Sequence, residues 1–216
     1  HRLWLLYRKF FRAKVRGKTS SEQSHMSHFQ FITRPLPFCP ADAPARPLYA
    51  LAQGETDKLP ESVRAFASAA GFAGNEGEFL LVPGGDGGLG AALFGLGNGA
   101  NPFVFGRLTK LLPAGDWRLA QYGGDATLAL TGFAAGSYRF ERYVKPATKV
   151  VRLAIPDSVD AAAVERAWAA ICLARDLVNT PANDMQPDHL EEVFAGLARH
   201  YDASFNAIRG DDLLSA

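Results

Sequence analysis

The sequence predicts an α/β fold for residues 26–156, followed by a long helix and the beginning of a second α/β domain. Three observations lead to this prediction. Short apolar runs separated by turn residues alternate with helical segments as far as Pro156, which is typical of a mixed sheet flanked by helices. One long helical segment follows. After it, a second helix, a candidate strand and a turn form an αβα series whose last helix has nothing yet to pack against.

The amino-acid composition supports a folded chain. Of the 216 residues 48% are hydrophobic, enough for the core of one large domain or of one domain plus part of another. Charge is distributed unevenly, because residues 1–25 hold seven Lys or Arg and one acid, whereas residues 26–216 hold 16 basic and 21 acidic side chains. The second part shows no clustered basic face, so nucleic acid is not an expected partner.

Cysteine usage and hydropathy indicate the compartment. Cys39 and Cys172 are the two cysteines, far apart and without a CxxC motif, which predicts neither a disulfide framework nor a zinc knuckle. No apolar run approaches the ~18–20 residues needed to cross a bilayer. We therefore expect a cytoplasmic protein without membrane association.

The first 25 residues form a basic, amphiphilic leader. A transit peptide or a membrane-surface helix would have such a composition. Against these readings, the leader begins with His1, its apolar stretch is too short for a secretory signal, and Met26 opens an ordinary-looking domain. We interpret residues 1–25 as a tail or a non-native leader and exclude them from the fold.

The first elements follow from local patterns. Short apolar runs occupy residues 29–32 and 47–52, and a helix is predicted over residues 58–71. Pro60 fits its first turn and Gly71 is placed to end it. The residues predicted to share its apolar face are Val63, Phe66 and Ala70.

A glycine-rich hairpin is predicted next. The apolar runs at 78–83 and 88–97 flank the turn Gly-Gly-Asp-Gly-Gly. Gly85 to Gly90 also matches GxGxxG, but dinucleotide binding needs a helix after the turn and the residues that follow are strand-like. The glycines that come later, Gly95, Gly97 and Gly99, could form an anion-binding nest or a plain loop. We favour the loop, because no basic residue follows until Arg107.

The remainder alternates helices and strands. A short helix is predicted to end near Pro113, residues 126–143 to form a strand and then a helix, and residues 149–156 to form a strand. The long helix covers residues 157–179 and ends at Asn179-Thr180-Pro181. Its predicted apolar face contains Val164, Trp168, Ile171 and Val178. Cys172 is expected to be a buried, inert thiol.

Past the long helix, a second helix is predicted from Pro187. Its apolar face would contain Leu190, Val193, Phe194 and Leu197. A candidate strand follows at residues 203–208. Gly210, Asp211 and Asp212 would then form the turn and cap of another helix.

No catalytic or metal-binding residue can be singled out. His189 and His200 lie eleven residues apart near one helix, without carboxylates to complete a metal site. The adjacent Asp211 and Asp212 fit a helix cap better than an acid–base pair. No Ser/His/Asp or Cys/His arrangement stands out.

Residues 174–198 carry the most specific signal. This stretch resembles the segment with which leucyl aminopeptidases, also called cytosol aminopeptidases, enter their catalytic domain. The family turn N-T-P-A-N-[DE]-M is matched in order by Asn179, Thr180, Pro181, Ala182, Asn183, Asp184 and Met185. Gln186 departs from the pattern, since the family has Thr or a small residue there and Gln caps a helix less well. Physically, the turn should end a helix, with Asn179 and Asn183 bonding the local backbone.

The resemblance implies a domain scheme. Residues 26–156 would be a variable N-terminal domain similar to the macro fold, and residues 157–216 a joining helix with the truncated start of the catalytic domain. The complete protein would be a cytoplasmic homo-hexamer that releases N-terminal amino acids from peptides. It would use two divalent metal ions, Mn or Zn, to lower the pKa of a bridging water and polarise the carbonyl.

The chain itself is expected to be inactive. In the family the metal ligands lie in a Gly- and Asp-rich stretch and an N-T-D-A-E-G-R-like motif beyond the turn, and neither occurs here. Two alternatives remain open. One is a standalone macro-like module that binds ADP-ribose or another anion. The other is a non-catalytic assembly or DNA-contacting role, which would require the basic patch that residues 26–216 lack.

Overall fold

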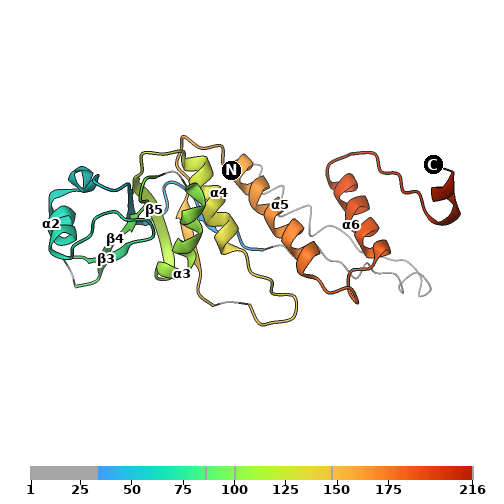
Figure 1. Ribbon diagram of the computed structural model, residues 1–216, viewed down its shortest axis with the longest axis horizontal. Coiled ribbons are helices and arrows are strands. Elements are labelled where there is room, and N and C mark those ends of the chain that lie inside the picture. The colour runs from blue at the N-terminus through green and yellow to red at the C-terminus, as the bar shows by residue number, and fades with distance from the viewer. Residues whose placement is uncertain (1–33, 86, 100, 147, 216) are drawn as a thin grey trace. The chain divides into compact units, whose positions relative to one another are not determined.

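The computed structural model describes residues 34–215 apart from residues 86, 100 and 147 (Figure 1). The predicted leader at residues 1–25 and the apolar run at 29–32 lie outside the described residues. The chain divides into two compact units, one of which spans Ile32–Thr180, while the other includes Pro181–Ala216. Among the described helices, none is long and apolar enough to span a membrane.

A six-stranded mixed sheet forms the centre of the unit Ile32–Thr180. Its strand order is β1-β6-β5-β2-β4-β3, and only β3 runs antiparallel to its neighbour. The strands are β1 (Phe38–Cys39), β2 (Arg46–Leu51), β3 (Phe79–Pro83), β4 (Leu89–Gly95), β5 (Gly115–Gln121) and β6 (Val151–Ala154). The predicted α/β fold with a mixed sheet is thereby confirmed.

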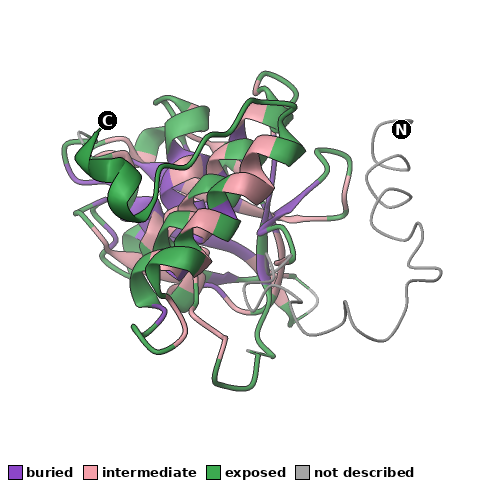
Figure 2. Cartoon of the chain, turned by 90° about the vertical axis from the view of Figure 1, so that its right-hand side faces the viewer, coloured by how far each residue is buried: buried purple, intermediate pink, exposed green. Residues whose placement is uncertain are grey.

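Helices cover both faces of this sheet. In chain order they are η1 (Thr56–Lys58), α2 (Glu61–Ala69), η2 (Pro102–Arg107), α3 (Leu108–Leu111), α4 (Ala126–Ser137) and α5 (Ala161–Asn179). The second unit contains α6 (Pro187–His200) and η3 (Gly210–Leu214). The buried residues concentrate in the strands and on the sides of the helices that face them (Figure 2).

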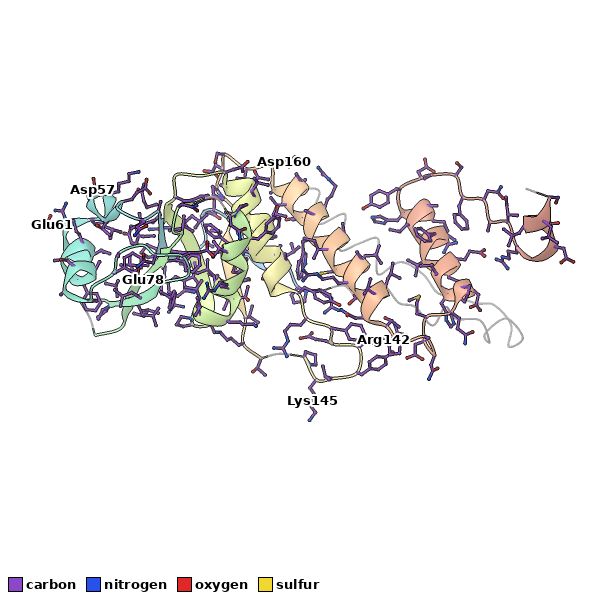
Figure 3. The ribbon with its side chains drawn as sticks, in the orientation of Figure 1. Asp57, Glu61, Glu78, Arg142, Lys145 and Asp160 are labelled. Carbon is purple, nitrogen blue, oxygen red and sulfur yellow. The ribbon has the colours of Figure 1, made fainter. Side chains whose placement is uncertain are left out.

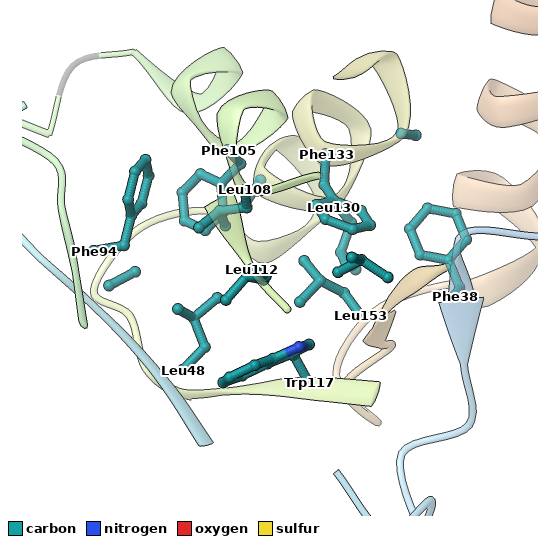
Figure 4. Packing of buried hydrophobic residues seen from close by; sticks show 14 of the residues in the cluster. Phe38, Leu48, Phe94, Phe105, Leu108, Leu112, Trp117, Leu130, Phe133 and Leu153 are labelled. Atoms are coloured by element: carbon teal, nitrogen blue, oxygen red, sulfur yellow. The ribbon is translucent and has the colours of Figure 1, made fainter. Parts of the chain in front are cut away.

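Alternation along the central strands creates two cores. In β4, Ala92 and Phe94 face the larger core, whereas Ala91 and Leu93 face a smaller core beneath α2, because successive strand side chains point to opposite faces. The larger core lies between the sheet and η2, α3, α4 and α5 (Figure 4). Phe105 is its aromatic centre, with its ring centroid 6.0 Å from Phe94 and 5.0 Å from Tyr122.

Several local predictions are confirmed. The runs around the glycine-rich turn pair as an antiparallel hairpin, β3 with β4. The helix before it ends where Gly71 takes a φ of +72°. The strand before Pro156 forms as β6, and the long helix stops at Asn179.

The strand predicted at the start of residues 126–143 is wrong. This segment is helix α4 from its first residue, because Asp125 caps it. The Asp125 Oδ1 accepts hydrogen bonds from the backbone N–H groups of Thr127 at 2.8 Å and Leu128 at 3.2 Å. The apolar run that resembled a strand is a helix with Leu130 and Phe133 in the core.

The sequence pattern does not predict strand β5, although it lies between β2 and β6 in the sheet. Its single fully buried side chain is Trp117, and charged residues interrupt the run. Trp117 donates from Nε1 to the carbonyl oxygen of Pro113 at 3.1 Å, and the guanidinium of Arg46 lies 4.5 Å from the Trp117 ring centroid. The strand pattern is weak because Trp117 is its one buried residue, while Leu119 packs against the same core but is only partly buried.

Two predicted helix faces need correction. In α2 the buried residues are Val63 and Ala67, while Phe66 and Ala70 are exposed. In α5, the buried residues recur every fourth position and exclude the predicted Val178, which is 84% exposed. They are Val164, Trp168, Cys172 and Asp176.

The second unit differs from the prediction in one element. Residues 203–208 form no strand, because the described part of this unit offers no other strand to pair with. Helix α6 forms as predicted. Gly210, Asp211 and Asp212 lie inside the 3-10 helix η3, whose N-cap is Arg209 without a side-chain hydrogen bond, so the predicted cap is wrong. Contacts group α5 with the sheet. The assignment of residues 157–216 to a joining helix and the truncated start of the catalytic domain stays a prediction.

Candidate functional site

The described residues offer no metal centre. No group of three or more His, Cys, Asp or Glu in that part of the chain is arranged to hold an ion. In α6, the Nδ1 atom of His189 accepts a hydrogen bond from the backbone of Gln186, and the His200 ring packs edge-on against Tyr201. Asp211 and Asp212 lie exposed in the first turn of η3. The two metals implied by the resemblance therefore have no donor set among these residues.

The glycine-rich loop after β4 uses its backbone amides internally. The N–H groups of Gly95, Leu96, Gly97 and Gly99 donate to Glu78, Leu51, Gly74 and Leu96 carbonyl oxygens, at 2.8 to 2.9 Å. An anion nest needs amides that point at the ligand. These amides are already engaged, which argues against ADP-ribose or another anion at this loop.

The GxGxxG match at residues 85–90 belongs to a hairpin turn. Gly84 donates its backbone N–H to the carbonyl oxygen of Gly88 at 2.7 Å, and β4 follows directly. Dinucleotide binding requires the N-terminus of a helix at this point. The hairpin interpretation is confirmed.

The family-identifying turn is divided between the two units. Asn179 is exposed and Thr180 is buried at the end of α5. The Thr180 Oγ1 donates to the carbonyl oxygen of Asp176 at 2.6 Å, so the last turn is closed by a side chain. Asn179 donates from Nδ2 to the Tyr138 hydroxyl at 3.1 Å. The expected bond from Asn179 to the local backbone is therefore wrong, because a residue 41 positions away supplies the acceptor.

The rest of the turn lies in the second unit. Asp184 donates its backbone N–H to the carbonyl oxygen of Pro181 at 2.9 Å, which reverses the chain, with Ala182 and Asn183 exposed. Met185 precedes the helix start. Gln186 stands at the N-cap of α6, and its own N–H donates to His189 Nδ1 at 3.1 Å. The helix forms despite the departure at Gln186, because His189 and Pro187 complete its first turn.

A polar network, buried at Arg34 and Asp176, holds the end of α5. We call it the Asp176 network; its members are Arg34, Tyr138, Glu141, Asp176 and Asn179. The Asp176 Oδ1 accepts hydrogen bonds from Arg34 Nη2 at 2.6 Å and from the Tyr138 hydroxyl at 2.9 Å. Arg34 also donates to the carbonyl oxygen of Arg139 and lies 4.0 Å from Glu141.

The charges of this network are shielded from water. The side chains of Arg34 and Asp176 are 7% and 9% exposed. A buried charge is tolerated when it is paired and hydrogen-bonded. Arg34 and Asp176 pair with each other, while the Arg34 Nε atom is buried without a hydrogen-bond partner among the described residues. Arg34 and Arg175 each place a guanidinium near the Tyr138 ring, at 5.1 and 5.3 Å from its centroid.

Burial also changes the acidity of the neighbouring groups. Removal from water raises the pKa of the Tyr138 hydroxyl, and the adjacent Asp176 carboxylate adds to the rise. Burial raises the pKa of the Cys172 thiol from its ordinary 9.0 to about 12. The thiol is therefore protonated and unreactive, as the sequence predicted. Nothing in this arrangement suits acid–base or nucleophilic chemistry; it fixes the segment that leads out of the sheet domain.

Neither Asp176 nor Arg34 was predicted as a site residue from the sequence. Asp176 stands within the quoted segment 174–198, one position after Arg175. The available signal was its spacing, since it follows Val164, Trp168 and Cys172 at four-residue intervals on the buried stripe. An acid on such a stripe predicts a buried cation partner, but its identity depends on the fold.

The comparisons with known proteins agree with this architecture. Residues 51–156 match the family described as M17 aminopeptidase, N-terminal domain. The cytosol aminopeptidase from Coxiella burnetii aligns with a TM-score of 0.70 and 29% identity, covering 79% of this chain and 39% of that chain. The bottromycin maturation enzyme BotP in complex with Mn aligns at 0.58 and 25%, covering 78% and 39%.

A leucyl aminopeptidase from Trypanosoma brucei aligns with a TM-score of 0.57 at 18% identity, covering 82% of this chain and 42% of that chain, which shows the fold alone. No curated protein matches the chain. The sheet, its helices and the matched region define an N-terminal domain of the M17 aminopeptidase type. The chain belongs to the leucyl aminopeptidase family, and it spans about two fifths of the length of the first two solved structures described above.

Proposed function

We propose that this chain is the N-terminal part of a metal-dependent aminopeptidase that releases N-terminal amino acids from peptides. The observation that carries the proposal is the match of residues 51–156 to the M17 N-terminal domain. The turn from Asn179 to Met185 supports it independently, because this turn lies outside the matched residues. The aminopeptidases among the structural neighbours are consistent with the same activity.

Within that protein, residues 34–180 would serve as a scaffold. The Asp176 network attaches the last turn of α5 to the sheet domain, and the chain then passes through Pro181 into the second unit. The scaffold role fits the absence of a donor cluster among the described residues. We further propose that the complete protein is a cytoplasmic homo-hexamer with two divalent metal ions, Mn or Zn. The neighbour BotP was solved with Mn.

The test compares the 216-residue chain with the product of the longer reading frame. Leucine-anilide hydrolysis is measured with added Mn or Zn, before and after a chelator. We expect turnover by the longer product, loss of turnover with the chelator, and no turnover by the 216-residue chain. Hydrolysis by the short chain would overturn the scaffold assignment, and an inactive, metal-free longer product would overturn the peptidase proposal.

A further inference from the structure

The connection between α4 and β6 is long for a compact domain. Its described residues, 138–146 and 148–150, contain no helix or strand, whereas most connections span about 2–6 residues and longer ones are commonly functional. Both ends are attached. Tyr138 belongs to the Asp176 network, and Lys149 donates from Nζ to the carbonyl oxygen of Lys110 at 2.9 Å.

The tip of this connection, residues 140–145, exposes apolar side chains, and two of its aromatic rings contact each other. Tyr143 is 52% exposed and Val144 is 58% exposed. Phe140 meets the Tyr143 ring edge-on, with centroids 5.7 Å apart, and the guanidinium of Arg142 lies 5.9 Å from the Tyr143 centroid. A tip held in this way loses little further entropy when it binds a partner.

Charge on the sheet unit is divided between two regions. The segment 139–149 holds four of the 16 basic residues of 26–216 and one acid, a net charge of +3, so the expectation that residues 26–216 have no basic cluster does not hold for this segment. Residues 55–78 hold five acids and two basic residues, a net charge of −3. Figure 3 shows the two regions well apart, with Asp57, Glu61 and Glu78 on the α2 side, and Arg142 and Lys145 on the connection. The two regions of one copy therefore do not neutralise each other.

A cavity lies beside the acidic region. It has a volume of about 350 Å³, at the small end of the roughly 300–1,000 Å³ found for binding pockets, and it has room for an aromatic side chain. One of its walls comes from α2, next to Glu61. The residues that line it include Pro47, Tyr49, Ser62, Val63, Phe66 and Val82.

We propose that the tip of one copy binds in the α2 cavity of a second copy. Tyr143 and Val144 enter the cavity, while Arg142 and Lys145 face Glu61 and its acidic neighbours. Each region repels its own kind, so the tip of one copy pairs with the acidic region of another. The proposed pairing is head-to-tail: the second copy offers its own tip to a third. A head-to-tail contact repeated from copy to copy forms a closed ring when the rotation between neighbouring copies adds up to one full turn. This inference rests on the proposed homo-hexamer. It names the tip and the α2 cavity as the two surfaces through which copies bind each other.

The first test measures self-association of the 216-residue chain by sedimentation velocity at low and high salt. We expect reversible association that weakens with salt. Lys145→Glu should weaken it about tenfold, and Arg166→Glu, the same charge change on the exposed part of α5, should leave it unchanged. Glu61→Lys should weaken it similarly, and combining Glu61→Lys with Lys145→Glu should restore it.

The outcomes separate two failures. A chain that stays monomeric at low salt overturns the contact. Association that Lys145→Glu and Glu61→Lys leave unchanged overturns this contact while the proposed self-assembly stands. The peptidase assay on the longer product reports on activity independently of both results.

The second test maps the contact directly. A photo-reactive phenylalanine analogue replaces Tyr143, and the variant is mixed with isotopically labelled wild-type chain before irradiation. We expect cross-links to labelled peptides from residues 47–66 or 82–91. Cross-links only to other labelled peptides, or none under conditions where the mixture associates, would contradict the proposal.

Discussion

At the scale of single residues, the most consequential feature is a charge on an apolar stripe. Asp176 occupies the fourth buried position of α5, after three apolar residues. Its carboxylate is stabilised by Arg34, which comes from the segment before β1, and by the hydroxyl of Tyr138. Removing one partner leaves the other charge buried without a counter-charge. The resulting loss of folding stability is larger than the net stability that the intact pair contributes.

We predict that Asp176→Ala lowers the free energy of unfolding by about 3 kcal/mol. The buried Arg34 guanidinium would then lack a carboxylate at hydrogen-bonding distance. Urea denaturation followed by tryptophan fluorescence reports the change, since Trp117 and Trp168 are buried. Arg166→Ala is the control, because its ion pair with Asp160 lies on the surface and should contribute nothing measurable. A loss below about 1 kcal/mol for Asp176→Ala would contradict the prediction.

Cys172 provides a second prediction. Its folded pKa is about 12 against an ordinary value of 9.0, so below pH 9 the thiol is protonated in both states. Between pH 9 and 12 the unfolded chain ionises first, and the stability contribution of the protonated thiol is lost over that window. We expect a fall in unfolding free energy through this range that is smaller in Cys172→Ala. An unchanged pH profile in the variant would show that the folded pKa is not raised.

Alkylation of Cys172 is the companion measurement. At about pH 8 the native thiol should react on the order of 10³-fold more slowly than in the urea-unfolded chain, because the thiolate is the reactive form. Mass spectrometry of the peptide that contains Cys172 measures both rates. Equal rates in the two states would contradict the burial-raised pKa.

At the scale of elements, the contact between η2 and α4 depends on glycines. A Cβ on Gly136 would lie 2.3 Å from the carbonyl oxygen of Gly106, and one on Gly132 would lie 2.5 Å from that of Pro102. These neighbours are backbone atoms, so the two elements can approach this closely only without side chains at the contact. The close approach allows Phe105 and Phe133 to share the larger core.

We predict that Gly136→Ala destabilises the protein by about 2 kcal/mol, because the overpacked contact must push η2 away from α4. Gly123→Ala is the matched control, since a Cβ there meets nothing within 4 Å, and it should stay within about 0.5 kcal/mol of the wild type. Thermal and urea unfolding measure both. Equal effects of the two substitutions would refute the close-contact explanation.

At the scale of the whole molecule, burial is unequal between the two units. Among the described residues from 181 to 215, only Val193 is buried, whereas strand β4 has five consecutive buried residues. Local stability follows buried apolar contacts, and segments with few of them open first. The exposed apolar residues of the second unit include Leu190, Phe194, Phe205, Ile208, Leu213 and Leu214.

We therefore predict that amides of α6 exchange hydrogen well before those of β4 in the 216-residue chain. Hydrogen exchange with mass spectrometry measures both segments in one experiment, with β4 as the internal reference. In the longer product, added contacts should slow exchange in α6 and leave β4 unchanged. Equal protection of α6 and β4 in the short chain would contradict the prediction.

The sequence by itself determined the features that act over a few residues. Pro181 and Gly71 mark helix ends, the glycine-rich turn predicts the β3–β4 hairpin, and the turn from Asn179 to Met185 identifies the family. These signals are local, because a proline, a cap or a left-handed glycine restricts only the backbone beside it.

Only the tertiary structure decided which distant segments meet. It placed β5 between β2 and β6 although only Trp117 and the partly buried Leu119 mark its core face, and it converted the expected strand after Asp125 into α4. It also brought Arg34 to Asp176 across 142 positions of sequence. Such contacts depend on the order of strands in the sheet and on what covers each face. The residue pattern of one segment carries no record of its neighbours in space, so the partner of the buried acid emerged only with the fold.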